Sequence, residues 1–183
     1  MTTYSIQKDN KVVESSACGI SSNQNYILKI VNVNDGGQIA RVYDLKNLKV
    51  YEFEMEDVNS EDGTNKHKFT YINSRSLNRS PIGKICFDFQ YISTENEVET
   101  VKLIFYKNRS KTKKSSSLKL QILKSEIDLF HLFRFSCVHP LEFIREINYV
   151  NPGLVTNCTS ENGLANYTLK AFEEINLEIT LPK

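Results

Sequence analysis

Residues 85–106 read ICFDFQYISTENEVETVKLIFY, and this stretch contains the clearest structural signal in the chain. Apolar and polar side chains alternate along it, as where Phe87 and Phe89 flank Asp88. Because successive side chains of a strand point to opposite faces of a sheet, this alternation predicts two strands that each bury one face. The polar centre, residues 93–97, predicts the loop between them, so the stretch predicts a β-hairpin.

The same alternation recurs along the chain and predicts a sheet of many short strands. Residues 118–122 continue the hairpin into a meander after a polar loop at 107–117. Asp35-Gly36-Gly37 predicts a tight turn, since glycine adopts the positive φ that such turns need. Seven or more strands at short spacing predict an antiparallel β-sandwich or open barrel. The other expected strands are residues 4–7, 12–14, 26–33, 39–43, 51–55, 69–72 and 175–181.

The pattern changes after Ser125, where apolar residues follow a helical spacing. Ser125 and Asp128 resemble a capping box, and a stripe of large apolar residues follows them. A second helical segment is expected to begin near Pro140 and to end at Asn151-Pro152-Gly153. The sequence therefore predicts an α+β, mostly β, fold with one or two helices in the C-terminal third. Pleckstrin-homology-like (PH-like) domains and oligonucleotide-binding (OB-like) barrels both fit this order of elements.

Length and composition are those of an ordinary globular protein. With 183 residues, of which 40% are hydrophobic and 25% charged, the chain is expected to form one domain over residues 1–183. A net charge of +1 gives no overall field that attracts nucleic acid or a membrane, so such binding would need a local cluster of charge. No apolar run predicts a transmembrane segment, and residues 1–17 do not resemble a signal peptide.

The four cysteines are scattered without paired spacing, which is typical of reduced thiols in the cytoplasm or nucleus. Cys137, His139 and Cys158 come nearest to a zinc site. Structural zinc usually takes close pairs of ligands, however, and a fourth ligand is missing from this set. We therefore expect neither a metal nor a cofactor.

The sequence contains none of the common motifs of enzyme chemistry. It lacks a glycine-rich phosphate loop, a nucleophile elbow and a His-Glu-x-x-His helix. Three histidines occur, His67, His131 and His139, and none has a sequence neighbour that would orient it as a general base. We expect a protein without catalytic activity.

The apolar helix is a candidate surface for binding another protein. It has more large side chains than one sheet contact requires, and the alternative is that it is buried against its own sheet. Our leading hypothesis is a non-enzymatic protein-binding adaptor or structural subunit of an intracellular eukaryotic complex, which uses this helix and an exposed strand edge. The expected partner-binding residues of the helix are Ile127, Phe130 and Phe133.

A basic loop at residues 107–117 supports a second hypothesis. It has five cations and no acid, so it could hold the phosphates of single-stranded nucleic acid or a phosphoinositide, with Tyr106 as a stacking platform for a base. The alternative is a solvated loop without a ligand. The expected anion-binding residues are Lys107, Arg109, Lys111, Lys113, Lys114 and Tyr106.

Overall fold

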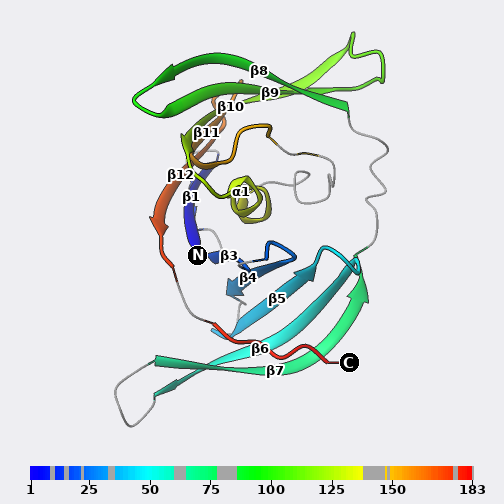
Figure 1. Ribbon diagram of the computed structural model, residues 1–183, viewed down its shortest axis with the longest axis vertical. Coiled ribbons are helices and arrows are strands. Elements are labelled where there is room, and N and C mark those ends of the chain that lie inside the picture. The colour runs from blue at the N-terminus through cyan, green and yellow to red at the C-terminus, as the bar shows by residue number, and fades with distance from the viewer. Residues whose placement is uncertain are drawn as a thin grey trace.

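The computed structural model describes residues 1–8, 11–14, 17–21, 23–32, 36–59, 65–77, 86–137, 147, 149–174 and 177–182. In these residues, one 12-stranded antiparallel sheet curves around a short helix (Figure 1). The strands are β1 (Thr2–Lys8), β2 (Lys11–Glu14), β3 (Ala17–Ile20), β4 (Tyr26–Asn32), β5 (Gln38–Asp44), β6 (Lys49–Asn59), β7 (Asn65–Ser76), β8 (Cys86–Glu95), β9 (Val98–Tyr106), β10 (Lys114–Lys124), β11 (Gly153–Ser160) and β12 (Ala165–Phe172), and the helix is α1 (Phe130–Cys137).

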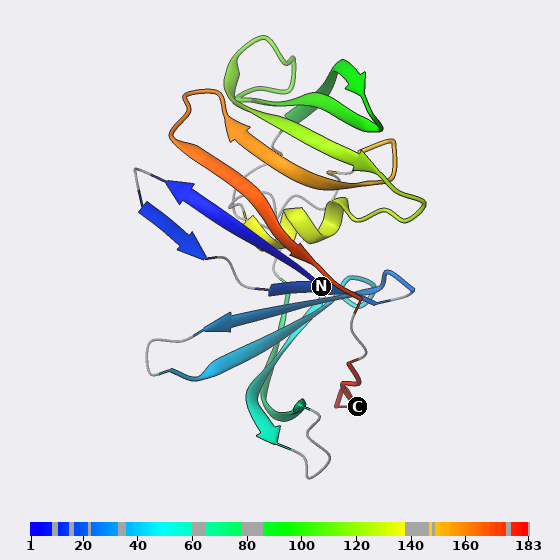
Figure 2. The same cartoon turned by 90° about the vertical axis from the view of Figure 1, so that its left-hand side faces the viewer.

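The strand order is β7-β6-β5-β4-β3-β1-β12-β11-β10-β9-β8, with β2 paired to β1 beside this path. The first and last strands of the chain, β1 and β12, are neighbours in the middle of the sheet and join its two meanders. Strands β7 and β8 follow one another in sequence, yet they are the two opposite edges of the sheet (Figures 1 and 2). The sheet is therefore open, and the predicted mostly-β antiparallel fold with a helix in the C-terminal part is confirmed.

The hairpin predicted from residues 85–106 is β8 and β9. Alternate residues of β9 are buried along its whole length, as its sequence pattern requires. The connection is tighter than expected, because the strands run to Glu95 and from Val98 and leave only Asn96 and Glu97 between them. Both residues have positive φ, 48° and 65°, which is the backbone geometry of a two-residue type I′ turn.

Helix α1 lies in the hollow of the curved sheet and joins its two halves (Figure 1). The Asp128 carboxylate accepts a hydrogen bond from the Phe130 backbone N–H at 3.0 Å and so satisfies one of the free donors at the start of the helix. Phe130 and Phe133 pack among the residues of β1 and β9–β12. Leu132 and Phe135 pack against β3–β6 together with Leu129, which immediately precedes the helix.

The β4–β6 part of the sheet is covered on both faces. The face that includes Val50 packs on the helix, whereas the opposite face, which includes Tyr51 and Phe53, packs on Ile179 and Leu181 of the C-terminal segment. A final strand was predicted at 175–181, and this is wrong for the described residues 177–182, which belong to no strand. Apolar and polar residues alternate in this segment because Ile179 and Leu181 pack on the sheet, while the segment itself belongs to no strand.

Two strands have no counterpart in the sequence prediction, β3 and β11, and β12 replaces a stretch without a clear pattern. Strand β7 is much longer than the predicted 69–72. The second helical segment, expected from near Pro140 to Asn151-Pro152-Gly153, lies mostly outside the described residues. Ile147, which is buried, and residues 149–152 are described and belong to no helix.

Candidate functional site

The apolar face of helix α1 is not open to a partner. Phe130 and Phe133 are 1% and 0% exposed, and Phe133 makes an edge-to-face contact with Tyr4 at 5.5 Å between ring centroids. The expected docking surface is therefore corrected for these two residues, because the curved sheet supplies apolar neighbours for both sides of the helix. Ile127 is 52% exposed, but it precedes the helix and lies apart from this core.

The basic loop between β9 and β10 is a compact turn. The side-chain amide of Asn108 donates to Ser110 Oγ at 2.7 Å and to Thr112 Oγ1 at 2.8 Å, and its carbonyl oxygen accepts from the Lys113 backbone N–H at 3.0 Å. Lys111 has a positive φ of 55° at the tip. The Lys107 backbone N–H donates to the Lys113 carbonyl oxygen at 2.8 Å, so backbone and side-chain hydrogen bonds together hold the loop.

Two of the five predicted anion-binding cations are neutralised by remote acids. Lys111 pairs with Asp88 of β8, and Lys114 pairs with Glu161 of the β11–β12 turn, which also binds Lys102 at 3.2 Å. The hydrogen bonds that Lys114 and Lys102 donate lower the pKa of Glu161 to about 2. The pairs reduce the net positive charge that the sequence alone assigns to this region.

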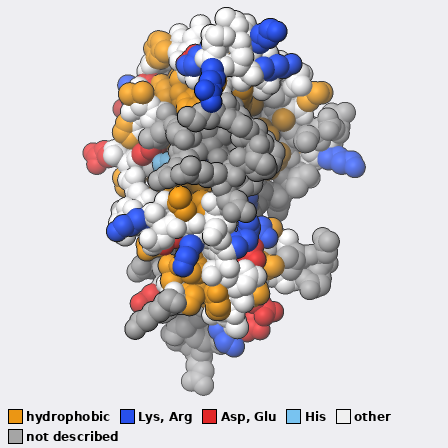
Figure 3. Space-filling view, turned by 90° about the vertical axis from the view of Figure 1, so that its right-hand side faces the viewer, with side chains coloured by type: hydrophobic (Ala, Val, Ile, Leu, Met, Phe, Trp, Pro, Cys, Tyr) orange, Lys and Arg blue, Asp and Glu red, His pale blue; other side chains and the backbone are white. Residues whose placement is uncertain are grey.

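The other three cations of the loop, Lys107, Arg109 and Lys113, are exposed and form no ion pair within the described part of the chain. Lys and Arg side chains stand out at the upper end of the molecule in Figure 3, the end at which this loop lies in Figure 1. Tyr106 is half-buried in β9, opposite Cys86 and Lys114 in the two neighbouring strands, so it offers only part of its ring for stacking.

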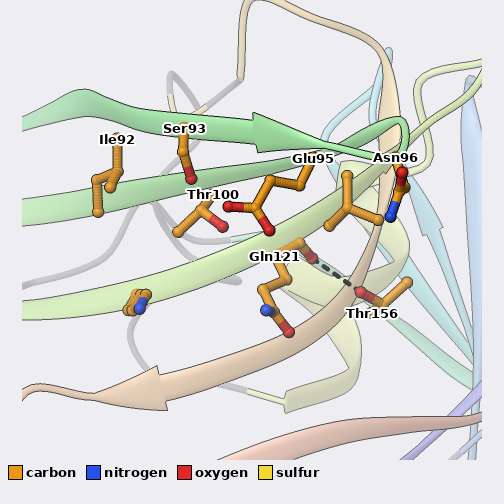
Figure 4. A pocket seen from close by; sticks show the side chains of 9 residues that line it. Ile92, Ser93, Glu95, Asn96, Thr100, Gln121 and Thr156 are labelled. Carbon is orange, nitrogen blue, oxygen red and sulfur yellow. Dashed lines mark hydrogen bonds between the residues drawn. The ribbon is translucent and has the colours of Figure 1, made fainter.

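A shallow pocket of about 470 Å³ lies on the sheet face opposite the helix (Figure 4). Two β-bulges shape it: Ile92 has no partner in β9, and Thr156 has no partner in β10, although its hydroxyl donates to the Gln121 carbonyl oxygen at 3.2 Å. Hydroxyl and amide groups dominate the lining, which includes no histidine or cysteine to act as a base or nucleophile. The lining residues are Ile92, Ser93, Glu95, Asn96, Val98, Thr100, Lys119, Gln121 and Thr156.

Among the described histidines and cysteines, His131 and Cys158 have shifted pKa values. His131 is half-buried, 3.8 Å from Asp128, and burial with the nearby Arg134 lowers its pKa. Cys158 is buried, and burial raises the pKa of its thiol, so it is a poor nucleophile. No three potential metal ligands come together among the described residues, which exclude His139 of the rejected zinc set.

The surface that sequence reasoning described least well is formed by the two end strands of the sheet path, β7 and β8. Among the described strands, β7 pairs only with β6 and β8 only with β9. All residues from Thr70 to Ser76 are exposed. Each edge presents a row of backbone N–H and C=O groups that no strand of the described sheet pairs. The sequence predicted a strand near each position but had no signal that these two would be the edges.

Comparison with protein-family models, with curated proteins and with solved structures finds no match for this chain. The PH-like and OB-like assignments therefore stay predictions. Among the residues that the structure describes, no helix has both the length and the apolar character needed to cross a membrane.

Proposed function

We propose that this chain is a non-enzymatic, protein-binding adaptor or structural subunit of an intracellular complex, and that it holds its partner at a free strand edge. The observation that carries the proposal is one side of β7, a strand of 12 residues, that no described strand pairs. Adding an extended segment to such an edge forms a row of main-chain hydrogen bonds, and this is a recurrent way in which proteins bind peptides.

Several features of β7 support its use as an interface. Natural proteins usually shorten, cover, bulge or charge their edge strands to prevent pairing. Strand β7 carries Lys68, Arg75 and a bulge at Ile72, yet it is long and presents Tyr71 and Ile72 at 45% and 49% exposure. The strand includes aromatic and β-branched residues, which favour pairing with another strand. Leaving such an edge open without a binding role would create an aggregation hazard.

The cellular location is part of the same proposal. The four cysteines are scattered through the sequence without paired spacing, and Cys158 is a free thiol in the described structure, as suits the reducing cytoplasm or nucleus.

The experiment compares proteins captured from a cell extract by the wild-type chain and by two variants. Ile72→Lys places a charge in the middle of the β7 edge, and Leu164→Lys is the matched control, since Leu164 is 57% exposed in the turn between β11 and β12. We expect Ile72→Lys to lose partners that the wild type and Leu164→Lys both retain. Identical capture by all three proteins would contradict the proposal.

The exposed cations of the basic loop support a second candidate function, an anion-binding module for single-stranded nucleic acid or phosphoinositide. Lys107, Arg109 and Lys113 have no acid beside them in the described structure, so their charges are open to a phosphate.

A further inference from the structure

The two end strands of the described sheet path, β7 and β8, carry the same exposed dipeptide. Tyr71-Ile72 lies on β7, and Tyr91-Ile92 lies on β8 with exposures of 60% and 49%. Each dipeptide sits at a β-bulge, because Ile72 has no opposite residue in β6 and Ile92 has none in β9. A bulge in an edge strand usually discourages pairing with another strand. The two strands therefore share both an exposed dipeptide and a bulge at the same place in it.

The charges of the two edges are opposite in sign and equal in spacing. In the described side chains of β7 the cations are Lys68 and Arg75, seven positions apart, and there is no acid. In β8 the acids are Asp88 and Glu95, also seven positions apart, and there is no cation. One antiparallel register can therefore satisfy both charge pairs at once.

We propose that β7 of one copy of this chain pairs antiparallel with β8 of a second copy, with Lys68 opposite Glu95 and Arg75 opposite Asp88. This inference rests on the proposed function and names its partner. The same register sets Tyr71 opposite Ile92 and Ile72 opposite Tyr91. Aromatic and β-branched pairs across neighbouring strands are among those that stabilise a sheet.

Two further pairs of this register are polar. Thr70 meets Ser93, and Asn73 meets Gln90, on either side of the central Tyr-Ile pairs. A shift of one residue in either direction sets Arg75 against Phe87 or Phe89 and breaks both charge pairs. The side chains thus favour one register.

The sides of the strands show why the partner is a second copy and not the same chain. Arg75 lies opposite Val50, on the side of the sheet that packs on helix α1. On β8 that side belongs to Phe89, which contacts Phe130, whereas Asp88 points to the other side. If β7 paired with β8 of the same chain, the sheet would close around the helix, and the helix-facing side of β7 would continue into the helix-facing side of β8. The register that pairs Arg75 with Asp88 instead continues the helix-facing side of β7 into the outer side of β8. A second copy that is turned over relative to the first allows this.

The ion pairs that these residues make within one chain are weak enough to exchange. Lys68 lies 3.5 Å from Glu56, with both side chains more than half exposed, and Arg75 lies 4.0 Å from Glu52. Asp88 pairs with Lys111 in the basic loop, where both side chains are more than 40% exposed. The two exposed pairs contribute little stability, and Arg75 lies at the distance limit of an ion pair with the largely buried Glu52, so re-pairing across the edges costs little.

The contact is heterologous, since each copy uses β7 on one side and β8 on the other. This gives a test by complementation, with sedimentation velocity as the readout. We expect the wild type to self-associate as its concentration rises. Ile72→Lys blocks the β7 edge and Tyr91→Lys blocks the β8 edge, and each alone should lower the association constant by about tenfold or more, a change of about 1.4 kcal/mol.

An equimolar mixture of the two variants should form a dimer and nothing larger, because one intact β7 edge and one intact β8 edge remain. Leu164→Lys should associate like the wild type. A wild type that stays monomeric at every concentration, or a mixture that does not dimerise, would overturn the inference. Circular dichroism checks that each variant is folded.

An exchange of charges gives a second test. Lys68→Glu and Glu95→Lys should each weaken association, and the two changes together in one chain should restore it.

The register has its own test. Thr70→Cys and Ser93→Cys on separate chains should form a mixed disulfide on oxidation, because directly opposed residues of an antiparallel pair lie about 4.5–5.5 Å apart at Cα. Thr70→Cys with Gln90→Cys is the out-of-register control and should not cross-link. Equal cross-linking of both pairs would reject this register.

The outcomes separate this inference from the proposed function. A monomeric wild type, together with a loss of captured partners in Ile72→Lys, rejects the second copy and leaves the proposed function standing. Self-association in the stated register, together with unchanged capture in Ile72→Lys, supports the second copy and rejects the binding of other proteins at β7.

Discussion

Tyr149 donates a hydrogen bond from its hydroxyl to the Glu99 carboxylate at 2.7 Å, and this contact ties the chain after the helix to the middle of the β8–β10 meander. Glu99 is only 5% exposed, and its two oxygens also accept from the Asn151 side-chain amide at 3.0 and 3.1 Å. These hydrogen bonds, together with Lys124 at 3.7 Å, outweigh burial and lower the pKa of Glu99. Burial and the same contact raise the pKa of Tyr149 to about 12. A buried carboxylate is thus kept charged by its neighbours.

Replacing Tyr149 by Phe should destabilise the fold by about 1–3 kcal/mol, because a buried carboxylate then lacks a donor. Urea unfolding at pH 7 measures this change. Tyr91→Phe is the matched control, since the Tyr91 hydroxyl is exposed and bonds only to Thr94 Oγ1 within the described structure. An equal loss in both variants would show that the buried contact contributes nothing special.

Glu99 should also make stability depend on pH in the acid range. Its pKa in the folded chain is below the ordinary 4.5, so its contribution is complete above about pH 4.5 and is lost as the pH falls through the lowered value. Glu99→Gln removes this group, and we expect its stability to fall less than that of the wild type between pH 5 and pH 3, a range set by typical carboxyl pKa values of about 4. The exposed Glu97→Gln is the control. Parallel pH curves for Glu99→Gln and the wild type would refute the argument.

Phe133 and Ile127 should differ sharply in their effect on stability. Phe133→Ala opens a cavity between the helix and the sheet and should cost about 3–5 kcal/mol. Ile127→Ala removes a side chain that is 52% exposed and should cost less than about 0.5 kcal/mol. Thermal and urea unfolding of both variants measure the difference. Similar losses would mean that the helix face is not the core described above.

Gly153 begins β11 at a point where no larger residue fits. A Cβ atom there would lie 2.5 Å from Ile122 Cγ2 and 2.8 Å from the Leu123 carbonyl oxygen, both in β10. Gly153→Ala should therefore cost about 1–3 kcal/mol through overpacking. The control is Gly19→Ala, whose Cβ would meet the flexible Met1 side chain at 3.3 Å. A Gly153→Ala protein as stable as Gly19→Ala would show that the backbone can shift without cost.

The sequence predicted strands well where burial is one-sided and uninterrupted, as in β9. It missed β11, because Gly153, Leu154 and Val155 are all buried and the bulge at Thr156 breaks the two-residue period. It wrongly predicted a strand at the C-terminus, since Ile179 and Leu181 face a core without pairing to another strand. The alternation of apolar and polar residues indicates which side chains are buried. It does not indicate which other segments of the chain pair with a strand.

The candidate sites were harder to predict than the fold for the same reason. Asp88 and Glu161 are remote in sequence from the basic loop, so only the folded chain brings them to Lys111 and Lys114. The edge position of β7 likewise follows from the order of the whole sheet and not from its own residues.

The anion-binding hypothesis predicts that the cations of the basic loop are unequal. Replacing Lys107, Arg109 and Lys113 by Gln removes the three that have no ion pair in the described structure, whereas replacing Lys111 and Lys114 by Gln removes two that are already neutralised. If the hypothesis holds, the triple change should weaken binding to a single-stranded oligonucleotide or to phosphoinositide vesicles by about tenfold or more at low salt, and the double change should do much less. The slope of log affinity against log salt should fall by about one for each phosphate that the variant no longer binds. Fluorescence anisotropy measures binding to the oligonucleotide, and vesicle sedimentation measures binding to the phosphoinositide, each across a salt series. Equal effects of the triple and the double change would contradict a special role for Lys107, Arg109 and Lys113.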